Sequence, residues 1–406
     1  MGEWLEKTLG ELTSYMAKGI PPKYVEAAGK ETIRVLNQKC NRNYRISYAE
    51  SRLHDNSVKK APEDKMLRDF DVLVNSTGTG TAGRVAQIWH VPEPTTLDGH
   101  MILMRPTEEI DPLYYGYAIK SFQAQVESFA EGSTGQTEIN KRRLQDEVVI
   151  RFPVSQDKQK AVGRMLKSID EKIQNNEEIN ENLLQQTVTL YEHLLQESEW
   201  PTATVLDVAE KVAMGPFGSN IKVSTFVPEG VPIISGNHLR GYFLEEPEFN
   251  YITEEHAERL KNSIVFPHDL IFTHAGNIGQ VAMIPDGCKF DQYVLSQRQF
   301  YLRCDETKVV PEFLLMFFHS TSGQHELLSY ANQTGVPSIA QPASNLKKIP
   351  FKCPPMQEQL VWKEQVHPLL GRYLNNRLEN ERLSTLRDAL LPKLMSGELD
   401  VSDLDL

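Results

Sequence analysis

The stretch that decides the fold is QKAVGRMLKSIDEKIQNNEEINENLLQQTVTLYEHLL, residues 159–195, because this chain of 406 residues contains it twice. A shift of 200 positions aligns it with QLVWKEQVHPLLGRYLNNRLENERLSTLRDALLPKLM, residues 359–395, and no gap is needed over the first 36 positions. The asparagine pair that ends at Asn176 returns in the second copy and ends at Asn376. The sequence therefore predicts two related long segments, each closing one half of a duplicated chain.

Each copy carries apolar residues spaced alternately four and three positions apart, which is the heptad seam of a long helix. The seam of the first copy holds Ile169, Ile173, Asn176, Asn180, Leu183, Thr187, Leu190 and Leu194. That of the second copy holds Leu369, Tyr373, Asn376, Asn380, Leu383, Arg387, Leu390 and Leu394. Two asparagines interrupt each seam at its centre, and pairing across an interface would fix the register, because an unpaired buried amide is costly. We expect a helix interface built on Asn176, Asn180, Leu183, Asn376, Asn380 and Leu383. The alternative is two solvent-exposed amphipathic helices whose asparagines match by accident.

Two prolines distinguish the second copy. Pro368 stands where the first copy has Ser168, and Pro392 lies near the other end. Proline inside a helix removes a hydrogen bond and clashes with the preceding turn. We therefore expect Pro368 to kink the second helix or to separate its first turns, and Pro392 to fray its end. The uninterrupted part, Leu369 to Leu391, would be about 35 Å long.

The duplication extends beyond the helices, with matching turns, strands and helix starts in each half. Phe70–Val74 leads into Gly80–Ala86, and His268–Phe272 leads into Gly276–Ala282, each an apolar strand, a GxxG turn and a second strand. Further predicted pairs are the strands Met101–Arg105 and Gln299–Arg303, the helix starts at Pro112 and Pro311, and the segments with Ile33 and Asn37 or Ile233 and Asn237. We predict an α+β architecture in the order domain, long helix, domain, long helix.

Composition narrows the class of protein. No run of eighteen apolar residues occurs and the first eighteen residues lack an apolar signal segment, so we expect no membrane span and a cytoplasmic protein. Four scattered cysteines fit a reducing compartment and form no metal motif. The net charge of −12 argues against nucleic acid. Residues 1–60, however, carry eleven Lys and Arg against seven Asp and Glu, so a DNA-binding surface would have to be local.

No motif for catalysis or metal binding stands out. Gly78 to Gly83 matches GxGxxG after an apolar strand, but the following Arg84–Trp89 favours a strand, whereas a dinucleotide site needs a helix there. HExxH, GxSxG, the P-loop and the DPPY motif of amino-methyltransferases are absent. We expect no catalytic residues, cofactor-binding residues or metal ligands in this chain.

Cations mixed with amides form the candidate nucleic-acid surface, because Arg and Lys contact guanine and phosphate while Asn and Gln contact adenine. In the first half the candidates are Arg34, Asn37, Lys39, Arg42, Arg45, Lys141 and Arg142. In the second half they are Ser219, Asn220, Lys222, Asn237, His238, Arg240, His274, Gln297 and Arg298. For any single residue a solvated polar loop is the simpler explanation. Two such sets, one in each half, strengthen the case for a surface.

Three segments resemble the specificity (S) subunits of type I restriction-modification systems. These are Gly215–Lys222 (GPFGSNIK), Pro354–Gln359 (PPMQEQ) before the second helix, and Leu386–Leu399 (LRDALLPKLMSGEL) at its end. The resemblance covers residues 1–400 and includes the GxxG turns and the two-domain, two-helix layout. It departs in two places: residues 1–60 lack the Gly-Pro-Phe-Gly-Ser segment, and Gln156–Gln159 is a degenerate copy of the segment before the helix.

The resemblance implies two target-recognition domains that each read half of a split double-stranded DNA sequence. The helices would pack as an antiparallel coiled coil with pseudo-twofold symmetry. The expected boundaries are 1–152 and 199–352 for the recognition domains, 153–198 and 353–396 for the spacer helices, and 397–406 for an acidic tail. Two modification (methyltransferase) subunits would dock on the helices and restriction subunits would join them. S-adenosylmethionine, ATP and Mg²⁺ would belong to those partners, with none in this chain.

Spacer length is consistent with this reading. A spacer of about 35–60 Å, from roughly 25–40 helical residues, would hold two DNA-reading domains roughly one to two helical turns of DNA apart. Two alternatives stay open: a coiled-coil adaptor that binds proteins and no DNA, and an enzyme that binds a nucleotide at Gly78–Gly83. The first predicts no DNA footprint, and the second predicts thermal stabilisation by a nucleotide.

Overall fold

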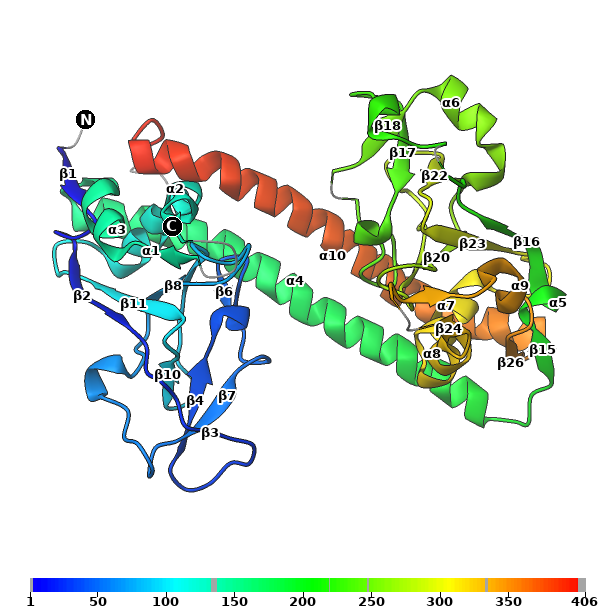
Figure 1. Cartoon of the computed structure of the whole chain (residues 1–406), viewed down its shortest axis with the longest axis horizontal. Helices are drawn as coiled ribbons and strands as arrows, with labels where there is room; N and C mark the ends of the chain where they lie inside the picture. Colours follow the sequence, from blue (N-terminus) through cyan, green and yellow to red (C-terminus); the bar gives the residue numbers. More distant parts are fainter. Residues whose placement is uncertain (1–2, 133–136, 219, 247, 333–334, 401–406) are drawn as a thin grey trace. The chain divides into compact units, whose positions relative to one another are not determined.

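The computed structural model describes residues 3–132, 137–218, 220–246, 248–332 and 335–400. The chain divides into two compact units. Unit 1 comprises Met1–Glu177 and Arg377–Leu406, and unit 2 comprises Glu178–Asn376. Each unit holds one α+β domain and half of each of two 41-residue helices, α4 (Gln156–Gln196) and α10 (Met356–Ser396) (Figure 1). The chain thus leaves unit 1 inside one long helix and returns to it inside the other.

The domain of unit 1 is built on two four-stranded sheets. The first has the order β2 (Thr13–Lys18), β11 (Met101–Pro106), β8 (Val72–Asn75), β9 (Val85–Gln87), and all its pairs are antiparallel. The second has the order β10 (Thr95–Leu97), β4 (Thr32–Leu36), β7 (Arg52–Asp55), β3 (Tyr24–Val25), with β10 and β4 parallel. β1 (Trp4–Thr8) pairs with β14 (Val149–Pro153), directly before α4. Val72 to Val74 are fully buried, which explains why β8 reads as a continuous apolar run.

The described part of this domain also contains the helices α1 (Pro112–Ser121), α2 (Gln123–Ser128) and α3 (Lys141–Glu147). α1 begins at Pro112, as predicted, because proline suits the first helical position. The Asp111 carboxylate caps it by accepting hydrogen bonds of 3.0 Å from the backbone N–H groups of Leu113 and Tyr114. Its buried face carries three tyrosines, so the core of unit 1 is rich in rings with polar ends.

Unit 2 repeats this plan. Its sheets have the orders β16 (Ala209–Met214), β23 (Gln299–Cys304), β20 (Leu270–Thr273), β21 (Val281–Met283), and β18 (Asn250–Ile252), β17 (Val231–Ile234), β22 (Tyr293–Leu295), β19 (Ile264–Val265). The central pair β17 and β22 is parallel, like β4 and β10. β15 (Thr202–Thr204) pairs with β26 (Pro350–Lys352), and the helices are α5 (Val205–Val208), α6 (Glu254–Arg259), α7 (Pro311–His319), α8 (Thr321–Leu328) and α9 (Pro342–Leu346). The predicted helix start at Pro311 is confirmed.

Two buried polar contacts recur in both units at equivalent positions. Arg105 Nε donates a hydrogen bond of 2.8 Å to Asp71, and Arg303 Nε donates one of 2.9 Å to Asp269. Both carboxylates are almost fully buried, and burial raises their pKa while the paired guanidinium opposes this shift. These pairs join the GxxG hairpin to the neighbouring strand in each domain.

The second recurring contact involves a glutamine in the first turn of each long helix. The backbone N–H of Asp111 donates 2.6 Å to Gln159 Oε1, and Gln159 Nε2 donates 2.8 Å to the Pro153 carbonyl. Gln359 makes the same pair of contacts with the N–H of Val310 and the carbonyl of Pro354, at 2.9 and 2.8 Å. The degenerate segment Gln156–Gln159 has therefore kept the glutamine that joins the first turn of each long helix to its domain.

The GxxG turns are β-hairpins, as predicted. β8 and β9 flank the first, and β20 and β21 flank the second. Gly83 and Gly279 both have φ of +87° to +89°, and a Cβ on Gly83 would lie 2.5 Å from the Glu127 backbone of α2. Glycine is therefore required for conformation and for space. A strand and not a helix follows Gly83, so no dinucleotide-binding turn forms here.

Pro368 does not separate the first turns of α10 and Pro392 does not fray its end, because α10 continues through both prolines. It begins at Met356, twelve residues before Pro368, and ends at Ser396, four residues after Pro392. Pro368 lies on the exposed side of the helix, as does Glu364, whose carbonyl lacks the hydrogen bond that a backbone N–H at position 368 would donate. Water can satisfy a carbonyl on that side, so the missing hydrogen bond does not end the helix.

α4 and α10 pack against each other through the predicted asparagines in antiparallel orientation. In unit 1, Asn176 Nδ2 donates 2.8 Å to Asn380 Oδ1, and Asn380 Nδ2 donates 3.2 Å to the Ile173 carbonyl. In unit 2, Asn376 Nδ2 donates 2.9 Å to Asn180 Oδ1, and Asn180 Nδ2 donates 3.1 Å to the Tyr373 carbonyl. The two helices exchange roles between the units, as expected of a duplicated chain. Leu183 and Leu383 are half-buried on the same helices.

One buried pair of residues between α4 and α10 differs between the two units. Asp170 and Arg387 form a buried ion pair of 2.6 Å in unit 1, where α4 and α10 meet the domain. Their equivalents in unit 2 are Leu370 and Thr187, which are also buried. The end of the helix pair is therefore charged in one unit and largely apolar in the other.

Candidate nucleic-acid interface

Loops at one edge of the unit 1 domain form a connected cluster. It consists of the 3-10 turn η1 (Gln38–Cys40) after β4, the turn before Gly83, and Asp98–His100 after β10. Thr77 Oγ1 lies 2.8 Å from His100 Nδ1 and 3.4 Å from Gln38 Oε1, and Asn75 Nδ2 donates 3.0 Å to the Gln38 carbonyl. Parallel pairing of β4 and β10 brings the ends of both strands to this edge. We call these loops the unit 1 loop cluster.

A cavity of about 490 Å³ opens beside this cluster. Its lining consists of Tyr24, Asn37, Gln38, Lys39, Ala49, Glu50, Ser51, Arg52, Asp98 and His100. The Arg52 guanidinium lies 3.5 Å from the centre of the Tyr24 ring, which restricts its motion. Tyr24, Arg52 and His100 were not among the sequence candidates. They come from three distant segments, and no local pattern links them.

Asn37 reaches the cavity, but its amide also holds η1 in place. Its Oδ1 accepts from the Lys39 backbone N–H at 2.8 Å, and its Nδ2 donates 2.6 Å to the Glu50 carbonyl. The Lys39 side chain is exposed. The sequence match of Asn37 with Asn237 requires correction, because the turn η4 (Gly236–His238) begins after Ser235. Ser235 is therefore the equivalent of Asn37, and Asn237 is the equivalent of Lys39.

A group of lysines lies near the same edge. Burial, together with the charges of Lys18 and Lys65, lowers the pKa of Lys141, so these three ammonium groups are close enough to interact. Lys65 Nζ donates 3.1 Å to the Gly19 carbonyl, and Lys18 pairs with Glu138, whose backbone bridges to Thr77. Of the three, the sequence had indicated only Lys141. Clustered ammonium groups of this kind suit phosphate.

The other candidates of unit 1 do not join this cluster. Arg34 Nε donates 2.8 Å to Glu93, and Arg45 pairs with Glu177 and donates 3.1 Å to the Asp170 carbonyl of α4. Arg45 therefore attaches the domain to the helix. Arg42 is exposed on β5 (Asn41–Arg42), and Arg142 is exposed beside Asp146 on α3.

In unit 2 the equivalent edge carries Gly215–Gly218, the described part of the Gly-Pro-Phe-Gly-Ser segment. Gln297 Nε2 donates 2.6 Å to the Gly218 carbonyl and 3.0 Å to the Ile221 carbonyl, which fixes this loop. A Cβ on Gly215 would lie 2.1 Å from the Ser296 carbonyl oxygen. A Cβ on Gly19 in unit 1 would likewise lie 2.1 Å from the Asp98 carbonyl oxygen. Unit 1 therefore has the equivalent glycine, although it lacks the rest of the segment.

Most candidates of unit 2 are exposed. They are Asn220, Lys222, Asn237, Arg240, Gln297 and Arg298. His274 Nε2 lies 3.1 Å from the Gln297 carbonyl, and His274 and Arg298 are joined by backbone hydrogen bonding. Phe217 is 71% exposed at the loop, an aromatic side chain that the sequence reasoning had not singled out. Ser219 lies outside the described residues.

His238 requires a correction. It is only 4% exposed, and its ring stacks on Phe249 at 4.5 Å. Its Nδ1 accepts from the Ser235 N–H at 2.8 Å, and burial lowers its pKa, which keeps the ring neutral. His238 therefore packs inside the domain and does not extend to the edge.

Within the described ranges, no group of three or more His, Cys, Asp or Glu side chains is arranged to hold a metal ion. No helix in the described part of the chain, including the two 41-residue helices, is long and apolar enough to cross a membrane.

Comparison with known proteins identifies the family. A family profile described as "Type I restriction modification DNA specificity domain" matches residues 1–185 and again residues 197–385. The MjaIX type I restriction enzyme specificity subunit of Methanocaldococcus jannaschii is 23% identical over 436 positions, covering 99% of this chain and 95% of the relative. A crystal structure of a type I restriction-modification S subunit from M. genitalium has the same fold, with a TM-score of 0.58, 17% identity, and coverage of 97% of this chain and 96% of the other. Because the profile spans nearly the whole chain in two copies, the protein belongs to the family of type I restriction-modification DNA specificity domains.

Proposed function

We propose that this chain is the sequence-specificity subunit of a DNA methyltransferase and restriction complex, in which each α+β domain reads one half of an asymmetric, bipartite DNA site. The observation that carries the proposal is the pair of equivalent loop clusters, which share a backbone plan and differ in side chains. His100 in unit 1 corresponds to Arg298 in unit 2, and Lys39 corresponds to Asn237. Different donors at equivalent positions favour different base pairs.

The two kinds of polar side chain would have different tasks. The lysines near Lys141 would bind phosphates and so contribute affinity without sequence preference. Arg52, stacked on Tyr24, would present a guanidinium of restricted motion, and such a group suits the O6 and N7 atoms of guanine. In unit 2, the exposed side chains of Arg298 and Asn237 would contact bases.

The helix pair would act as the spacer and as the docking surface for methyltransferase subunits. Forty-one residues correspond to a helix of about 60 Å. The proposal assigns the chain no chemistry of its own. S-adenosylmethionine, ATP and Mg²⁺ would be bound by the modification and restriction subunits, and the complex would act on DNA in the cytoplasm.

Methylome sequencing of cells with and without this gene tests the proposal. We expect one bipartite methylated motif to disappear with the gene, and an unchanged methylome would overturn the proposal. Replacing residues 1–150 with the first domain of another family member should change one half of that motif only. A change in both halves would show that the domains do not read DNA independently. A protein-binding adaptor would leave the methylome intact and give no DNA footprint.

A further inference from the structure

The loop Gly215–Gly218 of unit 2 presents an aromatic side chain to solvent. Gly215 and Pro216 are buried, whereas the side chain of Phe217 is 71% exposed. A phenyl ring left in water forgoes the free energy that its burial would provide. Single exposed apolar side chains are common on proteins, so the surroundings of Phe217 decide whether the ring has a partner.

The backbone on both sides of Phe217 is held in place. The N–H of Gly215 donates 2.8 Å to the carbonyl of Gln299, the first residue of β23. On the other side, Gln297 Nε2 donates 2.6 Å to the Gly218 carbonyl. Gly218 has φ of +63°, a conformation that favours glycine. The ring therefore projects from a fixed backbone, and a contact with it costs little ordering of the loop.

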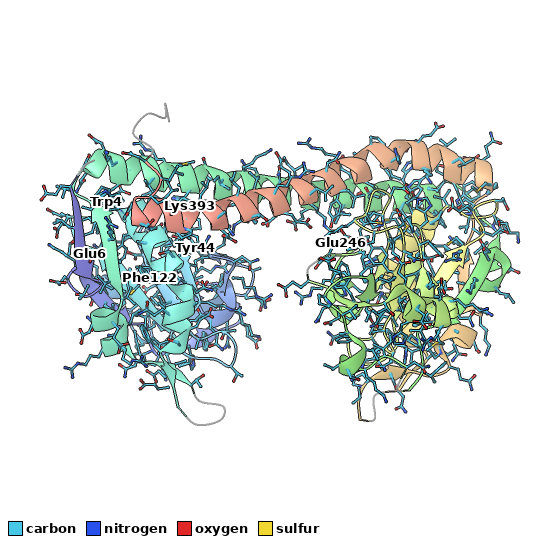
Figure 2. The ribbon with its side chains drawn as sticks, turned by 90° about the horizontal axis from the view of Figure 1, so that it is seen from above. Trp4, Glu6, Tyr44, Phe122, Glu246 and Lys393 are labelled. Atoms are coloured by element: carbon cyan, nitrogen blue, oxygen red, sulfur yellow. The ribbon has the colours of Figure 1, made fainter. Side chains whose placement is uncertain are left out.

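The segments that meet at this edge contain no Asp or Glu. They are residues 214–226, 270–284 and 292–304. The whole chain carries 55 Asp and Glu against 43 Lys and Arg, so the edge departs from the overall composition. Lys222 and Arg298 are exposed here. Glu246, labelled in Figure 2, accepts a hydrogen bond from the hydroxyl of Tyr293 at the start of β22, whereas Arg298 follows the end of that strand. Cations without carboxylates suit DNA.

The equivalent loop of unit 1 has no such ring. The N–H of Gly19 donates 3.1 Å to the carbonyl of the first residue of β11, which is the contact that Gly215 makes with β23. Pro21 is the second residue after Gly19, as Phe217 is the second after Gly215. Gly99 occupies the place of the glutamine that holds the unit 2 loop, and it has no side chain to do so. The two edges thus share a backbone plan and differ in this ring, as expected of a residue that reads sequence.

We propose that Phe217 contacts the C5 methyl group of a thymine in the half-site that unit 2 reads. This inference rests on the proposed function, because it requires that half-site. In the major groove, the thymine methyl is the one apolar group among the hydrogen-bond donors and acceptors that the base pairs present. An apolar ring on an edge that otherwise carries cations and amides therefore has one matching partner on DNA. Their contact removes apolar surface of both groups from water.

The surroundings of Phe217 favour this contact over two other uses of an exposed ring. A wedge that inserts between base pairs enters the minor groove, where the pattern of hydrogen-bonding groups is degenerate. Arg298 and Asn237, on the same edge, carry the guanidinium and amide groups that match the major groove. A ring that docked on a partner protein would gain nothing from the lack of Asp and Glu at this edge, whereas those carboxylates would repel a DNA backbone.

The test measures binding of duplex DNA to the complex of this chain with its methyltransferase subunits, by fluorescence anisotropy. The duplex carries the methylated motif, and its unit 2 half-site is the half that stays the same when residues 1–150 are replaced. Deoxyuridine replaces each thymine of that half in turn, which removes only a methyl group. Burial of one methyl group corresponds to roughly fourfold in affinity, so the wild type should lose that factor at one thymine.

Three variants assign the loss to the ring. Phe217→Ala should bind the thymine and deoxyuridine forms equally at that position, and Phe217→Leu, which keeps an apolar side chain, should retain most of the difference. Val223→Ala is the matched control, because Val223 is 83% exposed in the adjacent turn η3 (Val223–Thr225) and lies outside the anchored loop. It should behave like the wild type. Deoxyuridine in the other half-site should have the same effect in all four proteins.

The outcomes separate the two proposals. A deoxyuridine effect that is the same in the wild type and in Phe217→Ala overturns the methyl contact and leaves the proposed function standing. An equal loss of affinity for both forms of DNA in Phe217→Ala also overturns it, because the ring would then act without regard to the methyl group. Weaker assembly of Phe217→Ala with the methyltransferase subunits, measured by analytical ultracentrifugation, would assign the ring to a protein interface and contradict the proposal. If the wild-type complex binds no bipartite site, the proposed function fails and this inference fails with it.

Discussion

Asn176 Nδ2 donates a hydrogen bond of 2.8 Å to Asn380 Oδ1 in unit 1, and the same amide group lies 2.7 Å from Glu379. Both asparagines lie on the seam between α4 and α10, where Asn176 is fully buried and Asn380 is half-buried. A polar pair at this place opposes any shift of one helix along the other, because every other register would leave buried amides unpaired.

We therefore expect strong coupling between these two side chains. Asn176→Leu leaves Asn380 Oδ1 without its donor and should cost about 1–3 kcal/mol of unfolding free energy. The double variant Asn176→Leu, Asn380→Leu should cost less than the sum of the single variants, by about 1 kcal/mol. Urea denaturation of the four proteins measures this cycle. Asn175→Leu, one position away and exposed, is the control and should change stability by less than about 0.5 kcal/mol. Additive costs would mean that the pair does not fix the register.

The glutamines at the start of the long helices give a second prediction. Gln159→Ala leaves the N–H of Asp111 and the carbonyl of Pro153 without their partners inside the protein. We expect a loss of about 2–4 kcal/mol in unfolding free energy, and a similar loss for Gln359→Ala. Gln156→Ala is the matched control, because its side chain is exposed and donates to the Glu108 carbonyl at the surface. Equal losses of unfolding free energy for Gln156→Ala and Gln159→Ala would show that the buried contacts of Gln159 contribute no more than a surface hydrogen bond.

Much of the fold follows from local patterns in the sequence. The heptad spacing predicts both helices and their asparagine pairs, because a seam is periodic along one segment. The GxxG hairpins are equally local, since Gly83 and Gly279 occupy backbone conformations that favour glycine. Pro368 misled the prediction, because whether a proline breaks a helix depends on which side of the helix faces water.

The candidate site was less predictable, because its residues come from distant segments. Arg52 and Tyr24 meet only through the pairing of β7 with β3. His100 comes from a third segment, the turn between β10 and β11. Arg45 looks like a DNA contact in the sequence, but its ion pair with Glu177 forms only once α4 packs on the domain. His238 also looks like a DNA contact in the sequence, because its neighbours in the chain are polar. Its burial against Phe249 is a tertiary contact that this local pattern does not show.

Lys120 gives a prediction about pH. Burial is the main cause that lowers its pKa from 10.5 to about 8, so the unfolded chain holds this proton to a higher pH than the folded chain does. The contribution of this group to stability should therefore rise as pH increases from 7 to 9.5, by about 2 kcal/mol. The Cys304 thiol has the opposite effect on stability. Burial raises its pKa, so its contribution to stability falls as pH increases. The measured quantity is thus the difference in unfolding free energy between the wild type and Lys120→Met at each pH. A difference independent of pH would show that Lys120 is not buried as an ammonium.

The last prediction concerns which half of the DNA site each domain reads. Arg52→Ala removes a guanidinium that Tyr24 holds in place beside the unit 1 cavity, and Arg298→Ala removes an exposed one from unit 2. Loss of one specific arginine contact costs about 1–3 kcal/mol of discrimination at one base pair. Arg52→Ala should therefore relax one position in one half of the methylated motif, and Arg298→Ala one position in the other half. Arg142→Ala, which removes an exposed arginine of α3 that pairs with Asp146, should leave the motif unchanged. Sequencing of methylated sites in cells that express each variant reports all three outcomes. Relaxation of the same half by both variants would contradict the assignment of one half-site to each domain, because Arg52 and Arg298 belong to different units.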